Sequence, residues 1–458
     1  MRPRTYRATA AALAATVVTG VAAVTAVAAP SPAHLAAGQN AATWLTTQLE
    51  DGVLTNFGMP DIGLTIDALL ALKATGVAPA TADTVADRVA ANAAAFSYYE
   101  IDYDSDGDLD RIVDAGSTAK LLVAATAAGR DPKHFGGLDL DAMTRDLVAT
   151  SGPHRGRVRD TTPEVYGGDA SNTFDQSLAV LGLSRSGGAP DDVVGYLIRQ
   201  QCPAGGFRLN PDPAGAGCSS DDVPDVDSTA MAVQALLAAG AAPGAPGAAA
   251  KGVAWLEAAQ AADGSFVNGP HKPDPSLPAV ANSNSTGLAG QALAAAGATA
   301  AAEKAAGWII KLQRGGGTDQ GAIAYSPDAF GTGAIDDMLR DQWRRATAQA
   351  LLALAQVPFG EIGEQPAGSA SASPSASASP SGSASASPSA SASASASAST
   401  TPSTSASVSP SPSSAAPTTP GGGLPVTGDP ILRVAVLAVA LIAAGPALVL
   451  VARRRRRP

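Results

Sequence analysis

Apolar helical segments with one internal spacing recur along this chain. The clearest runs from Asp225 to Gly240, where Asp, Ser and Thr precede an unbroken run of apolar residues and Gln. Oxygen-bearing side chains accept hydrogen bonds from the first N–H groups of a helix, and glycine commonly ends one. A helix that is apolar on most faces has to be buried on most faces. This segment therefore predicts a helix in the interior of the protein.

Four close copies of this helix share a threonine that lies eleven residues before a glycine. They pair Thr65 with Gly76, Thr118 with Gly129, Thr229 with Gly240 and Thr286 with Gly297. Looser copies begin near Ser171 and Trp343. Six buried helices with a period of about 55 residues can hide their apolar faces only against neighbouring repeats. The pattern predicts a closed ring.

A second kind of helix alternates with the first. It is amphipathic and carries an aromatic residue, at Trp44, Tyr196, Trp255 and Trp308. In three copies a glutamine follows the aromatic residue by five positions, at Gln201, Gln260 and Gln313. We expect these helices to form the outer wall of the ring.

The turns that follow the glutamines and the helix start at Asp225 resemble the prenyltransferase and squalene-cyclase repeat. The resemblance covers residues 35–359 and implies an all-α fold, an α6/α6 toroid of six helix pairs. Terpenoid cyclases, protein prenyltransferase β-subunits and cobalamin carriers share that ring, so it indicates fold better than function.

Both ends of the chain resemble targeting signals. Residues 1–28 combine arginines, an apolar stretch and a small-residue cleavage site, which is typical of a secretory signal peptide. Residues 366–423 are uncharged and rich in Ser, Ala and Pro, and predict a disordered stalk.

The stalk leads into a pentapeptide, an apolar span at 431–452 and a basic tail at 453–458. The span is long enough for a single transmembrane helix, and the arginines place the tail in the cytoplasm. The array resembles an LPxTG sortase signal, with the motif at Leu424, Pro425, Val426, Thr427 and Gly428. The resemblance implies a membrane-inserted precursor, cleavage by sortase after Thr427 and covalent transfer of Thr427 to peptidoglycan. We expect a secreted, cell-wall-anchored protein of a Gram-positive surface.

Processing changes the charge. The full chain has 30 basic and 40 acidic residues. Removing the signal peptide and everything after Thr427 takes away nine arginines and Asp429, which leaves 21 basic and 39 acidic residues and a charge of −18. Such a field repels nucleic acid, so we expect no nucleic-acid partner.

Two cysteines, Cys202 and Cys218, lie sixteen residues apart in a Gly/Pro-rich segment. In an extracellular protein this pair predicts a disulfide that stabilises the fold by about 3 kcal/mol. Two free thiols are the alternative.

The weak catalytic candidates are Asp225 and Asp227. Their segment is similar to the D-x-D-D-T-A motif of class II terpenoid cyclases, in which the middle aspartate, here Asp227, protonates an alkene or epoxide. Ser228 replaces the third aspartate, and Phe, Trp and Tyr number only 19 of 458 residues, although carbocation chemistry favours aromatic walls. The sequence therefore favours a helix cap over a catalytic acid.

An aspartate-rich loop predicts a structural Ca²⁺ site, with a merely solvated acidic loop as the alternative. The spacing resembles an EF-hand-type loop, although position 12 is Val113. The expected ligands are Asp102, Asp104, Asp106, Asp108, Asp110 and Asp114.

The starts of the inner helices are expected to meet at one end of the ring and form a cup. Its predicted ligand-binding residues are Asn172, Asp175, Asp227 and Asn284. The inner helices are similar to those of cobalamin carriers, although the carriers' second domain is missing. The leading hypothesis is therefore a surface binding protein that captures a small hydrophobic or corrinoid-like ligand, leaning away from catalysis. The alternatives are an adhesin-like protein and a glycan-active or terpenoid-cyclase-like enzyme.

Overall fold

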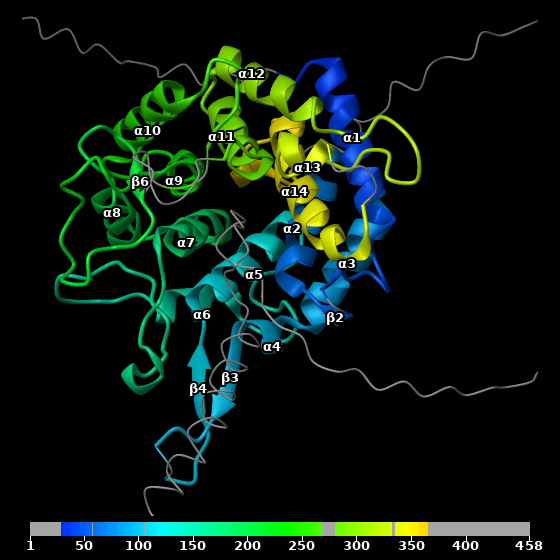
Figure 1. The fold of residues 1–458 in the computed structure, drawn as a ribbon. Helices are drawn as coiled ribbons and strands as arrows, with labels where there is room; N and C mark the ends of the chain where they lie inside the picture. Colours follow the sequence, from blue (N-terminus) through cyan, green and yellow to red (C-terminus); the bar gives the residue numbers. More distant parts are fainter. Residues whose placement is uncertain are drawn as a thin grey trace, which may run out of the picture.

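The computed structural model describes residues 29–56, 58–104, 106–267, 269, 280–331 and 335–364, without the side chains of residues 337 and 338. In this part of the chain, six inner helices contact one another in chain order, and the last contacts the first. They are α2 (Ile62–Thr75), α5 (Ala115–Ala127), α7 (Thr173–Ser186), α9 (Val226–Ala238), α11 (Ser283–Ala295) and α14 (Asp337–Ala355). The predicted ring is confirmed, and Figure 1 shows its centre enclosed by these helices.

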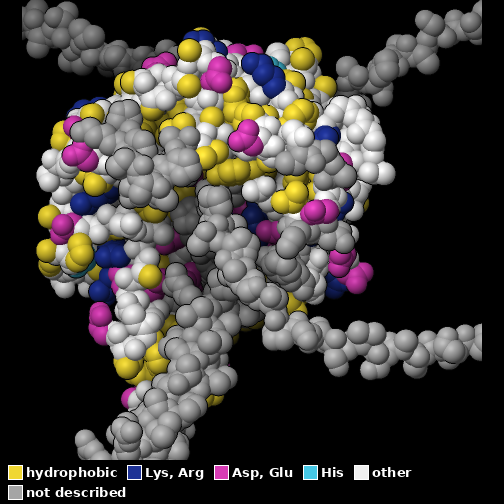
Figure 2. All heavy atoms as spheres, viewed as in Figure 1, with side chains coloured by type: hydrophobic (Ala, Val, Ile, Leu, Met, Phe, Trp, Pro, Cys, Tyr) yellow, Lys and Arg dark blue, Asp and Glu magenta, His cyan; other side chains and the backbone are white. Residues whose placement is uncertain are grey.

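An outer helix precedes each inner helix and packs against the ring. The outer helices are α1 (Pro32–Thr46), α3 (Pro79–Ala91), α6 (Leu140–Asp146), α8 (Asp191–Arg199), α10 (Ala245–Ala259) and α12 (Thr299–Ile310). The aromatic residues that marked this class in the sequence are buried between the two layers. Charged side chains of both signs are spread round the outside of the ring (Figure 2). The fold is therefore an α/α toroid.

A threonine near the start of the inner helix anchors four of the repeats. Its hydroxyl accepts a hydrogen bond from a backbone N–H group in the preceding connection, and we call this contact the threonine latch. The donor–acceptor pairs are Leu54 and Thr65 (2.9 Å), Phe207 and Thr229 (2.8 Å), Phe266 and Thr286 (3.0 Å), and Ile323 and Thr347 (2.9 Å). In α2, α9 and α11 the latch threonine lies four residues after the N-cap, so these three helices share one register along the ring axis. In the longer α14, Thr347 lies eleven residues after the N-cap Asp336.

The glutamines of the outer helices join successive repeats. The amide nitrogen of each donates to a carbonyl in its own turn and to one in the next outer helix. The second acceptors are Ala248 for Gln201, Ala301 for Gln260 and Ala37 for Gln313. Gln313 thereby closes the ring onto α1. The turn at Gly321 has a φ of 97°, and a Cβ there would lie 2.2 Å from the carbonyl oxygen of Asn40, so only glycine fits.

Three two-stranded antiparallel hairpins, which the repeats did not predict, lie in the connections between helices. They are β1 (Thr55–Asn56) with β2 (Met59–Pro60), β3 (Tyr98–Ile101) with β4 (Asp110–Val113), and β5 (Phe207–Arg208) with β6 (Pro224–Asp225). The β3–β4 hairpin projects away from the ring (Figure 1). Short helical segments complete the described chain: α4 (Ala93–Ser97), α13 (Pro327–Gly331), and the 3₁₀ turns η1 (Glu164–Tyr166) and η2 (Phe359–Glu361).

The segment around η2 closes the end of the ring where the inner helices finish. Gln291 Nε2 of α11 donates to the carbonyl of Val357 (2.7 Å), and the N–H group of Phe359 donates to Gln234 Oε1 of α9 (3.0 Å). Phe359 is buried and lies against the ring axis. We call residues 357–362 the plug.

Candidate active site

The side chains that face the ring axis come from equivalent positions on the inner helices. Two adjoining cavities lie on the axis. In each helix with a latch threonine, the residue two places after that threonine lines at least one of them, and in α5 the residue two places after Thr118 does the same. These residues are Asp67, Lys120, Met231, Leu288 and Gln349. Phe174 and Leu178 of α7 and Phe359 of the plug complete the wall of the first cavity. The axis of the ring therefore carries polar groups as well as apolar ones.

Asp225 is the N-cap of α9, as the sequence predicts. Its Oδ1 accepts from the N–H group of Ser228 (2.7 Å), and its Oδ2 accepts from the Ser228 hydroxyl (3.0 Å). The serine that replaces the third aspartate of the cyclase motif thus holds Asp225 in place. Burial raises the pKa of Asp225 to about 6 even though these hydrogen bonds favour the charged form.

Asp227 has a different role, because Asp225 already makes the cap. Met231 lies four residues further along α9, on the same helix face, and lines the axial cavity. The Asp227 side chain therefore lies on the face of α9 that looks into the ring. Its Oδ1 is buried and has no hydrogen-bond partner within the described residues.

Burial and the neighbouring Asp225 carboxylate raise the pKa of Asp227 to about 7, against a lowering by its hydrogen bond with Ser285. The N-terminus of a helix ordinarily stabilises an anion. Here the cost of burying the charge exceeds that effect, so a large share of Asp227 carries a proton at neutral pH. A protonated carboxyl group at this end of the ring can act as a general acid.

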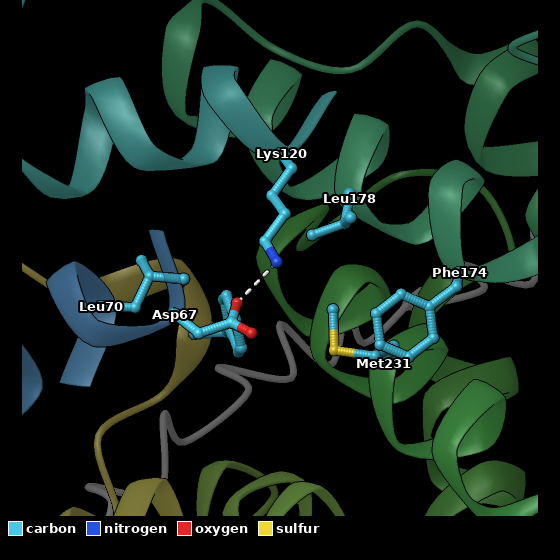
Figure 3. A pocket seen from close by; sticks show the side chains of 7 residues that line it. Asp67, Leu70, Lys120, Phe174, Leu178 and Met231 are labelled. Carbon is cyan, nitrogen blue, oxygen red and sulfur yellow. Dashed lines mark ion pairs between the residues drawn. The ribbon is translucent and has the colours of Figure 1, made fainter. Parts of the chain in front are cut away.

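A buried ion pair joins two neighbouring inner helices one turn deeper in the ring. Lys120 Nζ of α5 lies 2.7 Å from Asp67 Oδ1 of α2, and each side chain is only 7% exposed. Gln349 Nε2 of α14 makes a long contact of 3.4 Å with Asp67 Oδ2. Figure 3 shows Lys120 reaching across the pocket to Asp67, with Met231 and Phe174 on the opposite side.

The sequence reasoning missed Asp67 and Lys120. The available signal was a single charge, two residues after the repeat threonine, inside an otherwise apolar helix. A buried charge requires a partner, so two such charges in successive repeats indicate an internal pair.

The free space on the axis is small. Each cavity offers about 10 Å³ to the centre of a water molecule, which is room for about one water. Side chains, chiefly those of Leu70, Leu178, Met231 and Phe359, occupy the centre of the ring. This structure has no open cup among the described residues.

Two of the predicted cup residues stabilise the start of α7. The side chain of Asn172 accepts from the N–H group of Phe174 (2.8 Å), and Asp175 Oδ2 accepts from the N–H group of Asn172 (2.9 Å). This capping box accounts for both residues locally. Asn284 lies in the first turn of α11, at the position that Asp227 holds in α9.

The predicted calcium ligands separate into a tip and a base. Asp102, Asp104 and Asp106 can bring one carboxylate oxygen each within 4.8 Å of one another at the tip of the β3–β4 hairpin. Asp108 is exposed in the same loop, and Asp110 lies in β4. Asp114 is instead the N-cap of α5, where its Oδ1 accepts from the N–H group of Ser117 (2.7 Å). The calcium site stays a prediction, centred on the three tip residues.

Cys202 and Cys218 form a disulfide with a Cα–Cα distance of 4.7 Å. The signal peptide, the stalk, the pentapeptide Leu424–Gly428 and the apolar span at 431–452 lie outside the described residues. Within the described residues, no helix combines the length and the hydropathy needed to cross a bilayer.

Comparison with known proteins adds one partial sequence match, and no family model matches the chain. Drimenyl diphosphate synthase from Streptantibioticus cattleyicolor is 34% identical over 127 residues. The matched region covers 26% of this chain and only 23% of that enzyme. The chain therefore aligns with less than a quarter of the length of its curated relative.

Several solved structures are similar in outline. A crystal structure of a protein from Actinoplanes has 19% identity and a TM-score of 0.46, with 70% of this chain and 99% of that chain covered. The type II terpene cyclase MstE from Scytonema has 17% identity and a TM-score of 0.47, with coverages of 71% and 98%. Protein geranylgeranyltransferase-I from Candida albicans has 11% identity and a TM-score of 0.44, with coverages of 72% and 92%.

The expected binding role is wrong. The curated sequence match is to a terpenoid-forming enzyme rather than to a carrier, and it favours the enzymatic alternative over the binding module. The structure gives a physical reason for the same conclusion. A corrinoid needs an open cup, whereas side chains and the plug fill the described ring centre. The leaning away from catalysis is not supported either.

Proposed function

We propose that this protein is a terpenoid-cyclase-like enzyme in which Asp227 protonates a carbon–carbon double bond of a prenyl chain. The observation that carries the proposal is the position of Asp227 in the first turn of α9, with one buried oxygen that no described group satisfies. Burial raises the pKa of this carboxyl group to about 7, which favours its protonated form. The cyclase-like motif around Asp227 and the partial match to drimenyl diphosphate synthase support it.

In this mechanism Asp227 donates its proton to the terminal double bond of the chain and leaves a tertiary cation. The π electrons of the next double bond attack that cation and close a ring. Asp225 holds the start of α9 in place and, through its charge, keeps the pKa of Asp227 high. The ring of Phe174 lines the cavity, where its face can stabilise positive charge.

Protonation of a double bond uses no leaving group, so the proposal does not depend on the head group of the substrate. It does require space. Ligand pockets typically measure about 300–1,000 Å³, far more than the axial cavities offer. Turnover therefore requires flexible side chains such as Met231, together with Phe359 of the plug, to move aside.

The test is to incubate the purified protein with farnesyl and geranylgeranyl diphosphates and with the matching alcohols. Gas chromatography with mass spectrometry should detect cyclised isomers of the same mass as the substrate. Asp227→Asn, which keeps the size of the side chain and removes its acidity, should form them at least about 100-fold more slowly. Absence of cyclic product from every substrate would overturn the proposal.

We also propose that the enzyme works outside the cell, linked to the cell wall. The secretory signal, the LPVTG motif and the disulfide support this location. Mass spectrometry of wall fragments should find a peptide that ends at Thr427 and carries a peptidoglycan fragment, and it should disappear in a strain without sortase. Recovery of intact chain with its last 31 residues from the cytoplasm would contradict it.

A further inference from the structure

Asp67 lies across the ring from the proposed acid. The inner helices follow one another in chain order, and α14 contacts α2, so α2 and α9 are three steps apart in a ring of six described helices. They therefore form opposite walls (Figure 1). Asp227 comes from one wall and Asp67 from the other.

The two carboxyl groups also differ in depth. Asp227 lies two residues before its latch threonine, and Asp67 lies two residues after its own. Because the latches keep these helices in register, Asp67 is about 6 Å deeper along the axis, at about 1.5 Å for each residue. A chain protonated near Asp227 would extend past Asp67 if it followed the axis.

The surroundings of Asp67 keep one of its oxygens directed at the cavity. Lys120 of α5 takes Oδ1, and the contact from Gln349 of α14 to Oδ2 is long, at 3.4 Å. The other cavity-lining groups are uncharged: Phe174 and Leu178 from α7, Met231 from α9, Leu288 from α11 and Phe359 from the plug. Among the described residues that line the two cavities, Asp67 carries the only carboxylate.

We propose that Asp67 is the catalytic base that ends the cyclisation, an inference that rests on the proposed function. Once the ring has closed, Asp67 Oδ2 takes a proton from a carbon next to the cationic carbon. The electron pair of the broken C–H bond forms the new double bond, and an O–H bond forms on Asp67. The product is an isomer of the substrate, and the proton returns through solvent to Asp227.

Lys120 is a positioning residue in this proposal. Its ammonium group lies 2.7 Å from Oδ1 and orients the carboxyl group, so that Oδ2 stays available. A carbocation loses a neighbouring proton so readily that even a weak base suffices. Geometry rather than basicity then decides which proton leaves.

The first experiment compares products of the full-length protein. Asp67→Asn should lower the ratio of cyclic alkene to the alcohol formed by water capture at least tenfold, and Asp67→Glu should partly restore it. Asp83→Asn breaks an exposed Lys–Asp pair, Lys73 with Asp83, that lies outside the cavities, and should leave the ratio unchanged. An unchanged ratio in Asp67→Asn would overturn the proposal.

The second experiment needs no turnover. N,N-dimethyldodecylamine is protonated at neutral pH and mimics a tertiary cation on an alkyl chain, and its binding is measured by calorimetry below its micellar concentration. Lys120→Met should bind it at least tenfold more tightly than the natural protein, Asp67→Asn at least tenfold more weakly, and Asp83→Asn equally. Circular dichroism establishes that each variant is folded.

The two experiments separate the two proposals. Equal amine binding by all variants refutes the role of Asp67, even where Asp227-dependent cyclisation is observed. The second outcome is that the Asp67 and Lys120 variants change amine affinity as expected but the natural protein cyclises no prenyl chain. That result refutes the cyclase function and leaves Asp67 as a site that stabilises a cation.

Discussion

The starts of α9 and α11 are the same structure built with different chemistry. Asp225 caps α9 through the N–H group of Ser228 at 2.7 Å, and Asn282 caps α11 through that of Ser285 at 2.9 Å. Each helix also carries a threonine latch of nearly equal length, at 2.8 and 3.0 Å. At the second residue of the helix, however, α9 presents the carboxyl group of Asp227 where α11 presents the amide of Asn284.

The comparison shows that geometry belongs to the repeat, while reactivity belongs to one side chain. An amide at that position has no proton to give, whereas a buried carboxyl group holds one up to about pH 7. The capping role and the acid role, which the sequence analysis treated as alternatives, are divided here between Asp225 and Asp227. The following predictions test that division.

The largest effect is expected for Asp227→Asn, which gives α9 the side chain of α11. Loss of a general acid should reduce the cyclisation rate by about 10²- to 10⁴-fold, while the cap made by Asp225 is kept. The double variant that carries Asn284→Asp together with Asp227→Asn is the matched control. It should be no more active than Asp227→Asn alone. Rates come from product formation under single-turnover conditions. Activity at the natural level in Asp227→Asn would remove the acid role.

The second prediction concerns pH. An aspartate has an ordinary pKa of about 3.9, and the folded value of Asp227 is about 7. Because folding raises the pKa, the stability from burying the neutral group is fully present below about pH 4 and is lost as the pH rises to about 7. Its size is at most about 4 kcal/mol.

Urea unfolding of the natural protein and Asp227→Asn at pH 4, 5.5, 7 and 8 measures this effect. The difference between the two should fall with rising pH and level off above about pH 7. Asp160, with a pKa raised to about 6 mainly by burial, adds a similar slope to both proteins and cancels in the comparison. A constant difference would show that Asp227 does not titrate in this range.

The third prediction concerns what the two helices share. Thr229→Val and Thr286→Val each leave a buried N–H group, of Phe207 or Phe266, without its acceptor. Each change should lower the free energy of unfolding by about 1–3 kcal/mol, to a similar extent in both repeats. Thr84→Val, at an exposed position of α3, is the control and should have an effect within about 0.5 kcal/mol. A large effect in α9 alone would mean that the latch has a role specific to the acid.

The smallest effect is expected from calcium, at a site remote from both helix starts. Ca²⁺ at about 1 mM that binds Asp102, Asp104 and Asp106 with an affinity near 1 mM would stabilise the fold by about 0.4 kcal/mol. Thermal melting with Ca²⁺, with EGTA and with Asp104→Asn checks this. Equal melting temperatures in Ca²⁺ and EGTA would remove the site. The pH dependence that Asp227 causes should be the same in both conditions.

The repeat spacing alone predicted the ring, because the features that define it are local. A cap oxygen, a threonine and a terminal glycine act within one helix, so their order in the sequence survives folding unchanged. The glutamines at 201, 260 and 313 were visible for the same reason, although their contacts with the next outer helix were not. The hairpins and the plug were not predicted because their sequences contain no pattern that recurs from repeat to repeat.

The tertiary structure alone decided the chemistry of the ring axis. Asp67 and Lys120 come from different repeats, and the packing of α2 against α5 brings their charges to 2.7 Å. The proton on Asp227 depends on burial and on Ser285, which belongs to the next inner helix. A carboxyl group in a sequence is an ordinary acid, and only the low-dielectric surroundings assembled from several helices change which form it takes.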